Sequence, residues 1–253
     1  MGEILYKYLD VNGGLMMLKY HNLQFTNATK FNDPFDCHPA LFDYSNVPER
    51  KRKWPGADFI SKKEELDMEN LRKSTWICCL SLVYDSLLMW SYYNSHKGVC
   101  LGLNKDALLK SCNYKFFGML SPFAEEVQYR DIHQKPDYFK DHPSWIDLLT
   151  TKSKEWEHEK EVRIITKNPA WVNAGSDFPK EFENDSVVDG LEERFYPVMS
   201  RDCFESVFLG VNILPRNKTM MINAARKVNP TIKVYQMALD TSAFKLKAEL
   251  LDS

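Results

Sequence analysis

TWICCLSLVYDSLLMWSYYNSHKGVCLGL, residues 75–103, carries the strongest structural signal in the chain. Its first seven residues, Thr75–Ser81, form an apolar run of a length typical of a buried strand. Leu87–Asn94 is then expected to form a short helix, and Gly98–Leu103 a second strand. Strand, helix and strand in close succession predict a sheet with helices packed against it.

The rest of the chain mixes the same elements without strict alternation. Further strands are predicted at Ile4–Tyr8, Leu23–Thr26, Phe123–Tyr129, Glu161–Ile165, Ser206–Gly210, Lys233–Met237 and Ala243–Leu246. Further helices are predicted at Val11–Tyr20, Trp145–Glu157 and Asn217–Val228. This order predicts an α/β (α+β) fold: a single domain over residues 1–253, with a mixed or split β-sheet flanked by helices.

Two segments are expected at the surface of this domain. Residues 47–73 are rich in charged side chains, which predicts a surface insertion consisting of a loop and a solvated helix. Residues 168–193 contain Pro, Gly, Asn and Asp and are predicted to form a long loop.

The composition limits the partners. The 253 residues include 33 basic and 35 acidic side chains, so no overall positive field attracts nucleic acid or a membrane surface. No uninterrupted apolar run approaches the roughly 18 residues of a membrane span. Residues 1–6 lack an export signal, and the six cysteines form no C-x-x-C pair. We therefore expect a cytoplasmic protein with reduced thiols and no membrane partner.

The first polar-aromatic motif combines Leu5–Tyr8 with Phe31–Asp36. On a strand, Lys7 points to the face opposite Tyr6 and Tyr8. Lys7 is therefore a candidate site residue. The ligand-binding candidates from this motif are Tyr6, Asn32, Asp33 and Asp36. Alternatively, Asn32 and Asp33 only form a turn, because both residue types readily bond their own backbone.

The second motif runs from Ser81 to Gly98. A helix here places Trp90 and Tyr93 on one side, three residues apart, with His96 at its end. The candidate site residues in this motif, suited to a nucleotide or a sugar, are Ser81, Trp90, Tyr93 and His96. The alternative is that the aromatic stripe packs in the core and His96 caps the helix.

The third motif contains Glu159, Glu161 and Arg163, at a passage from helix to strand. Extended geometry places both carboxylates and the guanidinium on one face. Paired carboxylates perform acid-base chemistry when their surroundings separate their pKa values, so both are catalytic candidates and Arg163 is a ligand-binding candidate. Alternatively, this face is exposed and holds only a local Glu–Arg pair.

Several common chemistries lack their signatures in this chain. G-x-G-x-x-G, G-x-x-x-x-G-K-[ST], G-x-S-x-G and H-E-x-x-H are all absent from the sequence. The spacing predicts no metal site, although Asp36, Glu159 and Glu161 offer the hard oxygen ligands that a metal-dependent nuclease uses.

Together, the motifs resemble the bacterial domain of unknown function 2971 family. The matching segments are Leu5–Tyr8, Phe31–Asp36, Leu88–Gly98 and Trp156–Arg163, in the family's order and spacing. Ser206–Gly210 and the helix after it fit the usual end of the family, so the resemblance extends over nearly the whole chain. Val162, where the family usually has an aromatic residue, and the 47–73 insertion depart from it.

The order of these motifs also looks like the plan of ADP-ribosyltransferases. That resemblance implies NAD as co-substrate, with Lys7 contacting NAD and Tyr93 stacking on nicotinamide. It implies that Glu161 holds the ribose and stabilises an oxocarbenium-like transition state, while Glu159 helps to activate a macromolecular acceptor. The implied setting is a toxin or a phage-defence effector.

Two other functions remain open at this point. In one, the motifs hold a nucleotide or a peptide in a sensor module without turnover. In the other, the carboxylates bind the metal of a nuclease. The sequence predicts neither the acceptor nor the oligomeric state.

Overall fold

Strand β3 (Thr75–Ser81) joins two parts of one large sheet. The computed structural model describes residues 2–52, 56–115, 122–131, 135–167, 187–188, 191–192 and 194–251. β8 (Glu161–Lys167) pairs antiparallel with β3 along its full length. The other edge of β3 is shared by β2 (Phe25–Asn27) near its start and β1 (Ile4–Leu9) at its end, through Tyr6↔Ser81. The two parts therefore meet at a narrow junction.

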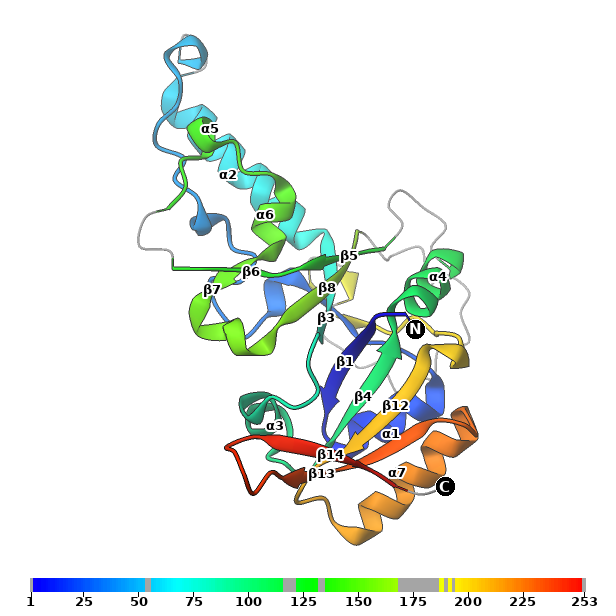
Figure 1. Cartoon of the computed structure of the whole chain (residues 1–253). Coiled ribbons are helices and arrows are strands. Elements are labelled where there is room, and N and C mark those ends of the chain that lie inside the picture. Colours follow the sequence, from blue (N-terminus) through cyan, green and yellow to red (C-terminus); the bar gives the residue numbers. More distant parts are fainter. Residues whose placement is uncertain are drawn as a thin grey trace.

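The part that begins with β1 is a five-stranded array (Figure 1). From β1 the order is β4 (Val99–Asn104), β12 (Phe204–Leu209), β13 (Lys233–Leu239) and β14 (Leu246–Leu250). Only β12 and β13 of this array run parallel, and α7 (Pro215–Val228) supplies the crossover that parallel strands need.

The remaining helices and strands include two separate two-stranded sheets. They are α1 (Val11–Tyr20), α2 (Ala57–Lys73), α3 (Leu87–Asn94), α4 (Lys105–Lys115), β5 (Phe123–Glu126), β6 (Gln128–Arg130), α5 (Tyr138–Asp141), α6 (Trp145–Thr150), β7 (Thr151–Ser153), the 3₁₀ helix η4 (Lys154–Glu159), β9 (Val187–Val188), β10 (Leu191–Glu192) and β11 (Arg194–Phe195). β5 pairs with β8, and β6 runs parallel to β7.

Helices cover the two faces of the five-stranded array unequally. α1 and α7 pack on one face, where apolar side chains of the strands and of both helices form the largest core cluster. α3 covers only part of the other face, placing Met89 and Trp90 against Tyr8, Cys100 and Phe208. This second face is therefore partly open.

Local chemistry explains where α1 begins and how it docks. Asp10 is its N-cap, and the carboxylate accepts a hydrogen bond of 2.6 Å from the Gly13 N–H. Gly14 lies against β4 so closely that a Cβ atom there would be 2.5 Å from Val99 Cγ2. The glycine thus allows the helix to approach the sheet.

Away from the array, α2, α5 and α6 form an arm that projects from the sheet (Figure 1). α2 corresponds to the helix expected within residues 47–73, and Met68 is its buried residue. Met68 packs in a separate apolar cluster with Phe42, Phe139 and Leu148.

Most elements lie where the sequence predicts them, and Val11–Tyr20, Thr75–Ser81 and Leu87–Asn94 have the predicted bounds. The predicted helix Trp145–Glu157 is wrong beyond Thr150. There the extended backbone at Thr151 opens β7, which pairs with β6 before η4 begins. β-branched threonines at 150 and 151 favour this change to extended backbone.

The predicted strands at Phe123–Tyr129 and Ala243–Leu246 also need correction. The first is divided into β5 and β6 at Val127. The second begins only at Leu246, because Asp240 accepts a hydrogen bond from the Ser242 N–H and closes a turn before it. The predicted loop 168–193 lies mostly outside the described residues. The few residues of it that are described form β9 and β10.

These elements confirm the predicted fold class: one mixed α/β domain with a nearly split sheet and flanking helices. Over the part of the chain that the structure describes, every helix is too short or too polar to cross a membrane.

Candidate functional site

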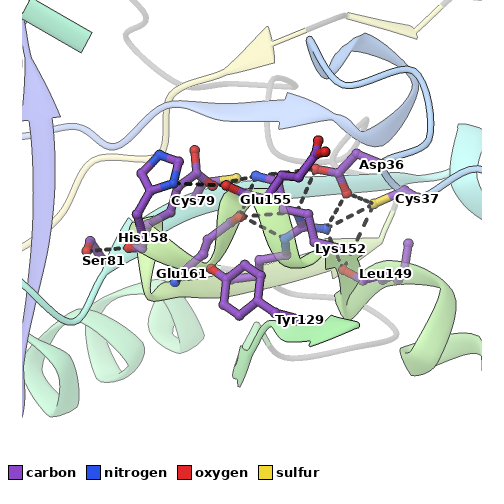
Figure 2. A network of polar contacts seen from close by, with 12 residues as sticks. Asp36, Cys37, Cys79, Ser81, Tyr129, Leu149, Lys152, Glu155, His158 and Glu161 are labelled. Carbon is purple, nitrogen blue, oxygen red and sulfur yellow. Dashed lines mark hydrogen bonds and ion pairs between the residues drawn. The ribbon is translucent and has the colours of Figure 1, made fainter. Parts of the chain in front are cut away.

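A buried network of charged side chains lies beside the junction of the two sheet parts (Figure 2). It consists of Asp36, Lys152, Glu159, Glu161 and Arg163. These residues come from the turn after β2, from β7, from the end of η4 and from β8. Each is less than a tenth exposed. Buried charges are rare unless paired, so their grouping requires explanation.

Arg163 is the centre of the network and is fully buried. Its two Nη atoms bind Asp36 Oδ1 and Oδ2 at 2.8 and 2.7 Å, and its Nε donates to Glu161 Oε1 at 2.8 Å. Nη1 also donates to the Leu149 carbonyl at 2.7 Å. The planar guanidinium thereby fixes both carboxylates in position.

Lys152 is the second cation, and the sequence analysis missed it. Its Nζ lies 2.5 Å from Glu159 Oε2, 3.0 Å from Glu161 Oε2 and 3.8 Å from Asp36 Oδ2. The predicted helix Trp145–Glu157 contains this position, and a lysine is ordinary there. The Thr150–Thr151 pair could have indicated Lys152 as a site residue. Two β-branched residues favour extended backbone here, and alternation along a strand then turns the side chain of residue 152 inward.

The two glutamates have different electrostatic environments. Burial opposes ionisation of Glu161, but the charges of Arg163 and Lys152 outweigh it and hold its carboxyl pKa far below the ordinary 4.5. Burial raises the pKa of Glu159 above 4.5, against the opposing charge of Lys152. Glu161 is therefore a fixed negative charge, whereas Glu159 is the carboxylate that more readily takes up a proton.

Tyr93 connects Glu159 to the surface. Its hydroxyl donates a hydrogen bond of 2.9 Å to Glu159 Oε1, while 48% of the residue is exposed. Burial of the hydroxyl and the charge of Glu159 raise the pKa of Tyr93, so the hydroxyl stays protonated as a donor. The exposed ring is available to a ligand.

A narrow cavity of about 70 Å³ opens next to Glu159, where β1 leaves β3. We call it the Glu159 pocket. Eight of the predicted site residues border it: Tyr6, Lys7, Asn32, Asp36, Ser81, Tyr93, Glu159 and Glu161. Lys7 Nζ donates to the Cys79 carbonyl at 2.8 Å, which holds this third cation at the pocket wall. Three motifs that are distant in sequence thus converge on one pocket.

Ser81 and Tyr129 hold the carboxylate-bearing backbone in place. Ser81 Oγ donates to the Glu159 carbonyl at 2.6 Å and accepts a hydrogen bond from the Val83 N–H at 3.1 Å. The Glu161 N–H donates to the Tyr129 hydroxyl at 2.8 Å. Tyr129 was not predicted, because nothing local to β6 marks it. Only the fold brings it to β8.

Four predicted residues do not border the pocket. Arg163 lies behind it within the network, as described. Asp33 accepts a hydrogen bond from the Phe35 N–H. Its side chain therefore forms a turn, as in the alternative interpretation of this motif. Trp90 is fully buried, and its Nε1 donates to the Tyr84 carbonyl at 2.7 Å. The His96 N–H bonds the Trp90 carbonyl at the end of α3.

The network does not resemble a metal site. Among the residues that the structure describes, no group of three or more His, Cys, Asp or Glu side chains is arranged to hold a metal ion. Asp36, Glu159 and Glu161 instead form ion pairs with Lys152 and Arg163. The carboxylates that the nuclease alternative requires are thus paired with cations in this structure.

Comparison with known proteins gives one family. Residues 89–164 match the family model described as "Protein of unknown function (DUF2971)". The match confirms the family resemblance seen in the sequence over this segment. The matched segment contains Tyr93, Lys152, Glu159, Glu161 and Arg163. The motifs with Lys7 and Asp36 precede its first residue and lie outside the match. No curated protein and no solved structure matches the chain.

Proposed function

We propose that the Glu159 pocket is the active site of an NAD-dependent enzyme that transfers ADP-ribose to an acceptor. The observation that carries the proposal is the convergence of Lys7, Tyr93, Glu159 and Glu161 on one pocket at the sheet junction. These are the four residues to which the ADP-ribosyltransferase resemblance gives roles, and they come from three separate motifs.

The pocket fits one end of NAD. A cavity of about 70 Å³ is too small for a whole dinucleotide, so only part of one ring or sugar would enter it. The exposed Tyr93 ring offers a stacking surface for nicotinamide, and carboxylates and hydroxyls border the space that a ribose would enter. The rest of the dinucleotide would extend out of this pocket.

The two glutamates suit the two demands of the reaction. Breaking the bond between ribose and nicotinamide releases neutral nicotinamide with the bonding electron pair and leaves positive charge on the ribose. Glu161, held ionised by Arg163 and Lys152, is a preorganised negative charge that stabilises this state. Glu159 then takes the proton that the attacking acceptor hydroxyl or amine loses.

This proposal is tested by NAD consumption with purified protein and candidate protein, DNA and RNA acceptors. We expect the wild type to release nicotinamide and E161Q to lose turnover while retaining NAD affinity. Absence of both binding and turnover in the wild type, with every acceptor, would contradict it.

A sensor module is the second candidate, favoured by the full pairing of the Glu161 carboxylate. Both of its oxygens already bind Arg163 or Lys152, as in a site that holds a ligand without turnover. Tight binding of a nucleotide without product formation would favour this candidate.

A cytoplasmic location belongs to either proposal, because the cysteines at 37, 78, 79, 100 and 203 are free thiols suited to a reducing compartment.

A further inference from the structure

A second hollow lies on the open face of the five-stranded array, which α1 and α7 leave uncovered. We call it the aromatic hollow, and its volume is about 300 Å³. The side chains that shape it are Tyr6, Tyr84, Phe208, Tyr235, Ser206 and Lys233. Four of its ten lining residues are aromatic, and two exposed side chains of opposite charge, Lys233 and Glu205, also border it. A polar rim around an aromatic lining indicates a ligand site.

Three of its rings form a parallel column. The ring centroids of Tyr84 and Phe208 are 4.4 Å apart with 15° between the planes, and those of Phe208 and Tyr235 are 4.8 Å apart with 9°. The column is held from one side by Tyr6, whose ring tilts against Tyr84 at 5.4 Å. Phe208 is the middle ring and is buried, so only the outer rings, Tyr84 and Tyr235, are partly exposed to a ligand.

Tyr6 belongs to both the aromatic hollow and the Glu159 pocket. Burial raises its pKa to about 12, so its hydroxyl remains a donor at neutral pH. Gly102 lies beneath this boundary, where a Cβ atom would come within 2.2 Å of Ser206 Oγ and 3.3 Å of Tyr6 Cε1. The close packing of strands at this position keeps Tyr6 as a wall common to both sites.

We propose that the aromatic hollow binds the adenine base of the ligand whose other end enters the Glu159 pocket. A flat ring with polar edges suits the outer rings of this column, which are bordered by a serine hydroxyl, tyrosine hydroxyls, a lysine and a glutamate. The Glu159 pocket alone is too small for a dinucleotide. Because the aromatic hollow shares Tyr6 with it, the two cavities together offer room for both ends of the ligand. The identity of the ligand rests on the proposed function, but the base site itself does not.

AMP is the probe for this site, titrated into the whole protein by calorimetry. Ala248 borders the hollow on β14 and is partly exposed, so A248L fills the space without removing a core side chain. We expect the wild type to bind AMP, A248L to bind it at least tenfold more weakly, and A248S to match the wild type. Absence of AMP binding by the wild type, or equal affinity in A248L, would overturn the proposal.

Kinetics with NAD separates this inference from the proposed function. A248L should raise KM for NAD at least tenfold with little change in kcat, whereas E159Q should abolish turnover and leave AMP affinity unchanged. AMP binding that A248L weakens, without NAD turnover, would support the base site and contradict the transferase. NAD turnover with an unchanged KM in A248L would contradict the base site alone.

Discussion

At the scale of single residues, Arg163 explains why so many charges tolerate burial together. Three carboxylates face two cations in the network, and Arg163 alone binds two of the carboxylates through well-directed hydrogen bonds. Bidentate pairing of this kind compensates part of the cost of removing charge from water. Loss of the guanidinium leaves that cost uncompensated.

R163M should therefore lower the free energy of unfolding by about 3 kcal/mol or more, because Asp36 and Glu161 lose their principal partner. The measurement is urea unfolding at pH 7. R130M is the matched control, since Arg130 is exposed and bonds only Gln128 among the described side chains, and it should cost no more than about 0.5 kcal/mol. A loss below about 1 kcal/mol in R163M would contradict this account of the network.

The low pKa of Glu161 predicts a particular dependence of stability on pH. The pKa of the Glu161 carboxyl is lower in the folded state than in the unfolded state, where it is about 4.5. Ionised Glu161 therefore stabilises the fold above about pH 4.5, and this stability is lost as the pH falls toward the folded-state pKa. Stability should thus decline from about pH 5 downward, and E161Q should decline less steeply. Urea midpoints from pH 7 to pH 3 measure both slopes. Identical slopes would show that Arg163 and Lys152 do not hold Glu161 ionised.

At the scale of elements, β3 and its neighbours were predictable, while β7 was not. Thr75–Ser81 and Leu87–Asn94 are marked by apolar pattern and length, which are local properties of the sequence. β7 has three residues and exists because β6 pairs with it, so its signal lies elsewhere in the chain. Lys152 was missed for that reason, and Glu159 was placed on an extended strand although it ends η4.

The site shows the same division. Convergence of Lys7, Tyr93 and Glu159 could be suspected from motif spacing, because polar residues among aromatics stand out in sequence. The turn at Asp33 and the burial of Trp90 depend on tertiary packing, and there the simpler alternatives describe the structure better.

The docking of α1 on β4 gives a prediction for an element. G14A should destabilise the protein by about 1–3 kcal/mol, because the new methyl group meets Val99 Cγ2 at 2.5 Å and forces the helix away from the sheet. G13A on the same helix is the comparison and should cost less, because the nearest atom there is Asp10 Oδ1 at 3.0 Å, although this carboxylate caps the helix. Thermal unfolding of both variants is the measurement. Equal midpoints would show that α1 does not pack as closely as described.

At the scale of the whole molecule, the near split of the sheet creates the site. β1 leaves β3 after Tyr6↔Ser81, and the Glu159 pocket opens where the two parts separate. β8 brings Glu161 and Arg163 from one part, while β1 brings Tyr6 and Lys7 from the other. A continuous sheet would close this space with strand pairing.

The most direct test compares nicotinamide release by the wild type, E159Q and E157Q. Glu157 lies on the same η4 helix as Glu159, but about half of its side chain is exposed and it pairs with Lys160. The account predicts release by the wild type and by E157Q, and loss of release in E159Q with NAD still bound. Equal release by E159Q and E157Q, or none by the wild type, would contradict the claim that the Glu159 pocket is an NAD-cleaving active site.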